Sequence, residues 1–228
     1  MRRLLNGLWS LNKTGGPWRL VPQACGHWSP IEGDCTRGRR DGVWARVMAT
    51  LRQWERRDRG HHPEPAAGSL DSQRLKTAPP TEASGVDGTT QLKGRTRQIL
   101  GDTLGVSMAG VGTSAATAAR LGVVAWLSQS VAEGVKRRRT RGGDGADPAE
   151  WLEAWVRGVQ QTPNMALEAT TTTEGQGFPV IPWRGAVERT FAWRLKDRRH
   201  RRDDARLTAH SVALIQMSMI RLVLHRWA

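Results

Sequence analysis

Tyrosine is absent from this chain of 228 residues, and phenylalanine occurs only twice, whereas tryptophan occurs 11 times. A protein of this size usually contains several tyrosines, so their absence indicates a bias in the sequence. Cysteine is as scarce as phenylalanine, at Cys25 and Cys35. Two cysteines with no second pair and no histidine at a fixed offset exclude a disulfide framework and argue against a zinc site.

Long apolar runs are also missing. The longest, LGVVAWL at 121–127, is far shorter than the roughly 18 residues that a membrane-spanning helix needs. The N-terminal MRRLLNGLWSLNK begins like a signal peptide, but Asn6 and Asn12 interrupt its apolar run and no small-residue cleavage site follows. We therefore expect a soluble cytoplasmic protein with no membrane partner.

Acidic residues are the minority among the charged ones. The chain has 35 Lys and Arg against 21 Asp and Glu, a net charge of +14 and a pI near 11.4. Such an excess of positive charge favours a polyanionic partner, because neutralising phosphates releases condensed counterions. Nucleic acid is the first candidate partner, and an anionic membrane surface is the second.

The first 60 residues predict a basic helical region, with twelve Arg and Lys against five Asp and Glu. Within it, the stretch 41–57 has apolar residues at offsets of three and four and arginines on the other face. The apolar set is Val43, Val47, Leu51 and Trp54, and the basic set is Arg46, Arg52, Arg56 and Arg57. Residues 61–68 have the composition of a linker, in which His61 and His62 are expected to be solvated.

The remainder, 69–228, predicts a mixed α/β domain, because a strand hairpin is followed by alternating helices and strands. We expect a short strand that runs into a polar turn over 69–77, a strand at 164–169, and a strand pair within 94–111 that turns at DTLG. We expect helices at 115–136, 148–159, 181–202 and 206–226.

Residues 110–115, GVGTSA, match the dinucleotide-binding pattern G-x-G-x-x-A, with Glu133 at about the right distance. That pattern requires the acidic residue to end a second strand, whereas Glu133 falls within the same predicted helix. A nucleotide-dependent oxidoreductase is therefore a minor alternative.

Three carboxylates are more informative. Asp71 is expected to end a strand, Asp144 lies in GGDGAD before a helix, and Glu188 lies on a late helix. Such carboxylates suit a two-metal site for phosphoryl transfer, because Mg²⁺ takes oxygen ligands and paired ions hold the attacking and leaving oxygens. Spacing alone leaves simpler readings open, since acidic residues are common at strand ends and Glu188 can pair with Arg184.

At these residues the chain resembles bacterial insertion-sequence transposases of the DDE type. The resemblance runs in order through NGLWSLNKTGGPWRLVP, RRDGVWARVMATLR, LDSQRLKT, KGRTRQILGDTLG, GDGADPAEWLEAWV, GFPVIPWRGAVERTFAW and RRHRRDD. It implies a ribonuclease-H-like catalytic domain at 69–228, with a mixed sheet flanked by helices, after an incomplete DNA-binding region at 1–60. It also implies that Asp71, Asp144 and Glu188 bind two Mg²⁺ or Mn²⁺ ions, which makes Glu188 a metal ligand rather than a salt-bridge partner.

The implied activity is strand cleavage and strand transfer, with double-stranded DNA of the element ends and the target as partner and a homo-oligomer assembled on DNA. The basic residues expected to contact phosphates are Arg46, Arg52, Arg56, Arg184, Lys196, Arg198 and Arg199. A solvated basic face is the simpler reading of the same residues.

The chain departs from the family at several positions. Asp147 replaces an aromatic residue, Gly185 replaces a Trp, and Asp204–Ala205 replace a Tyr-Glu pair. Family members also usually begin some tens of residues earlier. Most of the departures correspond to one T-to-G change, which suggests a truncated, decayed or misread copy. The alternative function is therefore a catalytically dead remnant that only binds nucleic acid.

Overall fold

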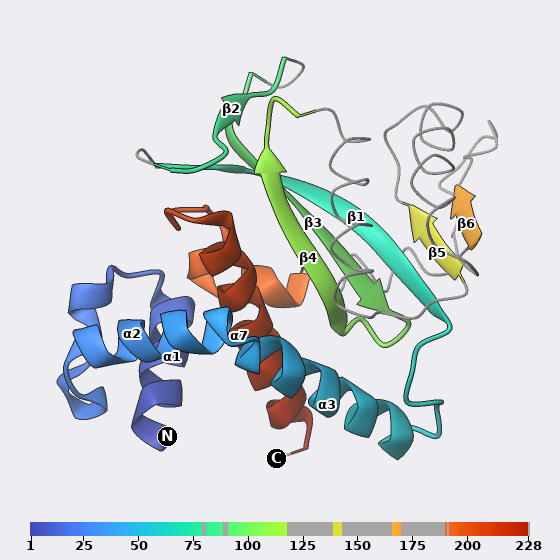
Figure 1. Ribbon diagram of the computed structural model, residues 1–228, viewed down its shortest axis with the longest axis horizontal. Helices are drawn as coiled ribbons and strands as arrows, with labels where there is room; N and C mark the ends of the chain where they lie inside the picture. The colour runs from blue at the N-terminus through green and yellow to red at the C-terminus, as the bar shows by residue number, and fades with distance from the viewer. Residues whose placement is uncertain are drawn as a thin grey trace.

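The computed structural model describes residues 1–78, 81–88, 91–117, 139–142, 166–169, 190 and 192–227. These residues form a group of helices packed beside a mixed β-sheet, as Figure 1 shows. The α/β class predicted from the sequence is therefore confirmed. No helix among the described residues is long and apolar enough to cross a bilayer.

The N-terminal region is helical, as predicted. It contains α1 (Arg2–Thr14), the 3₁₀ turns η1 (Trp18–Leu20) and η2 (Gln23–Cys25), α2 (Trp28–Arg40) and α3 (Val43–Asp58). Gly15 ends α1 in a left-handed conformation, with its N–H donating to the carbonyl of Leu11, which is a common way to end a helix. The chain can therefore turn sharply into the short 3₁₀ segments.

Among the described residues, the sheet has six strands, and it contains both antiparallel and parallel pairs. The strands are β1 (Ala67–Lys76), β2 (Gly85–Val86), β3 (Lys93–Asp102), β4 (Ser107–Ser114), β5 (Arg139–Gly142) and β6 (Ala166–Ala169). Strand β3 pairs antiparallel with β1, β2 and β4, whereas β5 runs parallel to both β1 and β6. The strand pair predicted within 94–111 is thus β3 and β4, and the predicted turn at DTLG joins them.

The residues of the turn between β3 and β4 suit its backbone conformation. Gly105 has a φ of 75°, a left-handed conformation that favours glycine, and its N–H donates to the carbonyl of Asp102. The carboxylate of Asp102 accepts the backbone N–H groups of Leu104 and Val106 at 3.0 and 2.8 Å. One carboxylate therefore supplies hydrogen-bond acceptors for most of the turn.

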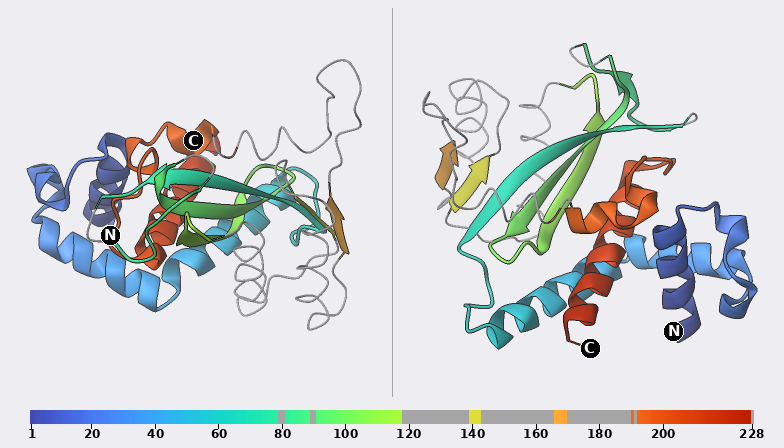
Figure 2. Two further views of the ribbon diagram at one scale, coloured as in Figure 1. Left: turned by 90° about the horizontal axis from the view of Figure 1, so that it is seen from above. Right: turned by 180° about the vertical axis from the view of Figure 1, so that it is seen from behind.

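The C-terminal segment contains η3 (Arg198–His200) and the long helix α7 (Thr208–Arg226), which confirms the predicted helix at 206–226. Helix α7 packs against α1, α2, α3 and β4 (Figure 2). An apolar cluster of described residues joins both ends of the chain and consists of Leu8, Ile31, Cys35, Trp44, Met48, Leu51, Val106, Ala213, Leu214, Met217, Met219, Ile220 and Val223. The hydrophobic core thus contains residues from both sides of the linker expected at 61–68.

The buried face of α3 differs from the prediction. Val47 and Trp54, expected in the apolar stripe, are 37% and 51% exposed, whereas Trp44 and Met48 are buried. The stripe is rotated by about one residue because it includes the carboxylate of Glu55, which accepts hydrogen bonds from two side chains at the end of α7. An apolar pattern cannot reveal a buried carboxylate of this kind.

Candidate active site

Asp71 lies in the middle of β1, where its backbone pairs opposite Ile99 of β3. The prediction that Asp71 ends a strand is wrong, because β1 continues to Lys76 and its second half stays paired with β3. Polar residues such as Ser72 and Gln73 looked like a turn in the sequence, but they are ladder positions of the sheet. Asp71 therefore lies on a strand that is paired on both sides, with β3 and with β5.

Strand β5 lies beside β1 on the side away from β3. The parallel register places Leu70, the residue before Asp71, opposite Gly142. Asp144 lies outside the described residues, but Gly142 precedes it by only two positions. Adjacent strands are separated by about 4.8 Å, so the described part of β5 ends beside the residue that precedes Asp71.

Thr190 connects the C-terminal segment to the same part of the sheet. Its buried hydroxyl donates to the carbonyl of Gly105 at 2.8 Å. A Cβ at Gly101 would lie 3.3 Å from this hydroxyl, and Gly101 pairs with Ser69 of β1. Glu188 and Arg184 lie outside the described residues, and Glu188 precedes Thr190 by two positions.

Two arginines of β3 hold the C-terminal segment against the sheet. Arg97 donates from Nε to the carboxylate of Asp203 at 3.2 Å and to the hydroxyl of Ser211 at 3.0 Å. Arg95 donates to the carbonyls of Ala205 and Arg206 at 2.7 and 2.8 Å. Arg95, Arg97 and Asp203 are almost completely buried, so this cluster is a structural clamp.

Sequence reasoning missed this clamp. The available signal was the alternation of arginines at positions 95 and 97 of a predicted strand, which places both on one face. The acidic partner is more than 100 residues away along the chain, so no local pattern identifies it. Ala205 stands at one position where the chain departs from the transposases that it resembles. Its backbone atoms take part in the clamp independently of its side chain.

A second buried network lies beside the clamp. The hydroxyl of Ser218 donates to the carboxylate of Asp197 at 2.7 Å and lies 2.7 Å from Nε2 of His200. The amide of Asn12 donates to the same hydroxyl at 3.0 Å, which links α1 to α7. Burial, together with nearby arginines that include Arg97, holds the pKa of His200 well below its usual range.

The expected basic face of α3 is only partly solvated. Arg56 is buried and donates from Nη1 to Asp102 at 3.1 Å and from Nε to the carbonyl of His62 at 2.8 Å. Arg52 is buried as well and points toward the carbonyl of Ser107. The prediction that Arg52 and Arg56 lie on an exposed phosphate-binding face is therefore wrong, because both guanidinium groups face the sheet.

The remaining basic candidates differ in exposure. Arg46, Lys196 and Arg198 are exposed. Arg199 is half-buried and donates from Nη1 to the carbonyl of Gly16 at 2.7 Å, and burial lowers its pKa. Arg199 thus connects η3 to the N-terminal helices, while the first three side chains are accessible to a polyanion.

The described residues contain no group of three or more His, Cys, Asp or Glu side chains arranged to hold a metal ion. Because Asp144 and Glu188 lie outside these residues, the predicted ligand set remains a prediction. The segment GVGTSA lies mostly within β4, where Gly110 and Gly112 pair with Ile99 and Arg97 of β3. Those glycines are ladder residues and do not form the loop before a helix that the dinucleotide pattern requires.

No protein-family model matches the chain, and a search of curated proteins returned no match.

Proposed function

We propose that this chain is a DDE-type DNA transposase, in which Asp71, Asp144 and Glu188 bind two Mg²⁺ or Mn²⁺ ions. The observation that carries the proposal is that described neighbours of all three carboxylates converge on one part of the sheet. Leu70 and Gly142 pair across β1 and β5, and Thr190 bonds to the turn that follows Gly101.

Chain connectivity strengthens this argument. Each residue of a chain spans at most about 3.6 Å, so two residues span about 7 Å. Asp144 follows Gly142 by two positions and Glu188 precedes Thr190 by two. Three carboxylates that start from such close anchor points can supply the oxygen ligands that hard divalent ions prefer.

The face of the sheet is also suitable. Directly opposed residues of an antiparallel pair share a face, so position 71 belongs to the same face as position 99. On that face of β3, Arg97 contacts Asp203 and position 101 adjoins Thr190. The C-terminal segment therefore covers the side of the sheet to which position 71 belongs.

Asp71, Asp144 and Glu188 would hold the two ions, and such ions would supply the activation of water for nicking at the element's end and of the freed 3′-hydroxyl for attack on target DNA. The pairing of β1 with both neighbouring strands would keep the first ligand in place. Lys196, Arg198 and Arg46 are exposed cations that suit phosphate contacts, within a chain of net charge +14. The mixed sheet flanked by helices is compatible with the ribonuclease-H-like domain that the resemblance implies.

The test is nicking of supercoiled plasmid by the full chain with Mg²⁺ or Mn²⁺, and the same assay after chelation. We expect Asp71→Asn and Glu188→Gln to reduce nicking at least about 100-fold, because even outer residues around a metal cost 10–100-fold when mutated. Asp58→Asn, an exposed carboxylate at the end of α3, is the matched control and should leave the rate unchanged.

Nicking that survives both substitutions would contradict the assignment of the triad. A folded protein that binds DNA but nicks none would instead support the alternative, a transposase remnant that only binds nucleic acid. Oligomerisation on DNA belongs to the same proposal, and sedimentation with and without an element end measures it.

A further inference from the structure

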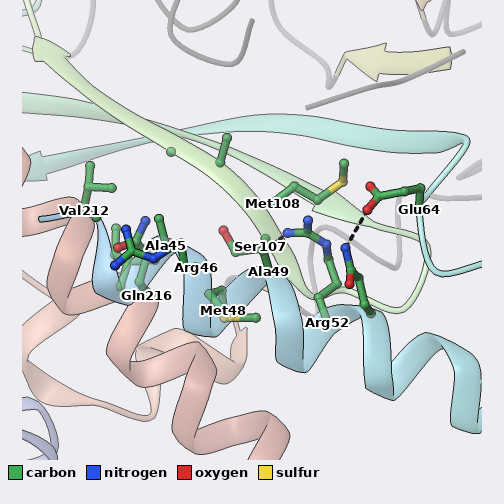
Figure 3. Close-up of a pocket in the computed structure, with 15 residues that line it drawn as sticks. Ala45, Arg46, Met48, Ala49, Arg52, Glu64, Ser107, Met108, Val212 and Gln216 are labelled. Carbon is green, nitrogen blue, oxygen red and sulfur yellow. Dashed lines mark hydrogen bonds between the residues drawn. The ribbon is translucent and has the colours of Figure 1, made fainter. Parts of the chain in front are cut away.

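A pocket of about 400 Å³ lies between α3, β4 and α7 (Figure 3), and Asp71 is not among its lining residues. Small and apolar residues form much of its wall, including Ala45, Met48, Ala49, Met108, Val212 and Ile215. Its volume falls in the range of small-molecule sites, which are mostly apolar with a few polar groups that orient the ligand.

One polar group in this pocket is unusual. The side chain of Arg52 extends from α3 toward β4, and the residue is only 5% exposed (Figure 3). Within the described part of the chain its buried Nε has no hydrogen-bond partner, and the one hydrogen bond of its guanidinium there, from Nη1 to the carbonyl of Ser107, is long at 3.5 Å. Among the described residues, no carboxylate forms an ion pair with Arg52.

The pocket lining also contains one acidic side chain, Glu64, whose negative charge acts on Arg52 without forming an ion pair with it among the described residues. Glu64 accepts a hydrogen bond from the amide of Gln53 at 2.7 Å, which Figure 3 marks with a dashed line. Arg56, one turn after Arg52, has its own carboxylate in Asp102 at 3.1 Å. Two arginines of one helix are therefore buried, but only Arg56 has a paired anion.

An unpaired buried charge is costly, because a guanidinium loses its hydration when it leaves water. Burial lowers the pKa of Arg52, and the charges of Asp102 and Glu64 offset only part of that effect. Arg46 adds a second positive charge to the lining. It lies nearer the N-terminal end of α3 than Arg52, beside Gln216. The pocket thus combines two arginines and one carboxylate with an apolar wall, so its lining carries a net positive charge, and it contains space for a ligand.

We propose that this pocket binds a small monocarboxylate with a short apolar chain, whose carboxylate pairs with Arg52 and whose chain packs on Met48 and Met108. A guanidinium binds a carboxylate through two parallel hydrogen bonds, which suits an Nε with no other partner. The methionine side chains adapt to irregular apolar ligands. This site is independent of the proposed transposase chemistry.

The test uses hexanoate as the probe and hexanamide, which has the same chain without the charge, as the matched ligand. Isothermal titration of the full chain in a low-salt buffer should show saturable binding of hexanoate and at least tenfold weaker binding of hexanamide. Arg52→Met should weaken hexanoate binding at least tenfold. Arg57→Met, which removes an exposed arginine of the same helix, should leave it unchanged.

A measurement on the unmutated protein keeps the proposal testable even where Arg52→Met does not fold. With ¹³C-methyl methionine, hexanoate should shift the resonances of Met48 and Met108, whereas hexanamide should leave them in place. Equal binding of the two ligands, unchanged binding by Arg52→Met, or the absence of saturable binding would each overturn the proposal.

Discussion

Several buried charged residues of this protein share one opposite charge. Asp203 is only 1% exposed and lies 3.2 Å from Arg97 and 3.4 Å from Arg95. One carboxylate therefore balances two buried guanidinium groups. Removing one member of a buried pair leaves an uncompensated charge, which is more damaging than the net stability of the pair suggests.

We predict that Asp203→Asn lowers the free energy of unfolding by about 3–5 kcal/mol, since it keeps the shape of the side chain but removes its charge. The neighbouring Asp204→Asn is the matched control. Asp204 is half-exposed and lies 3.6 Å from Arg202, so its loss should cost less than about 1 kcal/mol. Urea denaturation of the three proteins measures both values, and equal effects would contradict the clamp.

The sequence alone does not show which individual arginines of α3 are buried. Arg46, Arg52 and Arg56 look equivalent in the sequence of α3, yet the first is exposed and the other two are buried. The difference arises from Ser107 and Asp102, which belong to distant strands. Net charge was predictable from the residues alone, but the orientation of each guanidinium depended on tertiary packing.

At the scale of single elements, α2 contains two glycines in different surroundings. A Cβ at Gly33 would meet no atom within 4 Å, whereas a Cβ at Gly38 would lie 2.7 Å from the ring of Trp44. The ring is held in place because its Nε1 donates to the carbonyl of Cys35 at 3.0 Å. Gly33 thus only lowers the stability of the helix, whereas Gly38 leaves the space that the ring of Trp44 occupies.

We predict that Gly33→Ala raises the free energy of unfolding by about 0.5–1 kcal/mol, because alanine has the higher helix propensity. Gly38→Ala should lower it by about 1–3 kcal/mol, because the new methyl group overpacks against Trp44. Thermal and urea unfolding of both variants test the prediction. Stabilisation by Gly38→Ala would mean that Trp44 is free to move.

The elements themselves were largely predictable. Periodicity predicted α3 and α7, and the turn residues around Gly105 located the connection between β3 and β4. The extent of β1 was not predictable, because Ser72 and Gln73 are polar and their strand conformation depends on pairing with β3. Cross-strand pairing overrides local propensity in such positions.

For the whole molecule, the property that bears most on DNA binding is the net charge of +14. We predict sequence-independent binding to duplex DNA, with a logarithmic affinity that falls linearly with the logarithm of salt concentration, by about 0.9 per phosphate contact. Replacing Lys196 and Arg198 together by Gln should reduce that slope by up to about 2. Fluorescence anisotropy with two unrelated duplexes over a salt series measures the slope.

The control replaces Arg37 and Arg40 by Gln, which removes the same charge from two exposed arginines of α2. It should leave the slope unchanged if DNA lies along η3. An equal reduction in both double variants would instead indicate a diffuse attraction with no preferred surface.

The amino-acid sequence by itself determined the positive charge, the helical N-terminal region and the strand pair around Gly105, because these follow from composition, periodicity and local turn chemistry. Tertiary structure alone decided that Leu70 lies opposite Gly142 and that Asn12 bonds to Ser218. It also decided that Arg97 is buried with an ion-pair partner, whereas Arg52 is buried with none among the described residues. The physical reason is that each of these outcomes depends on a partner far away along the chain, which only folding brings within reach.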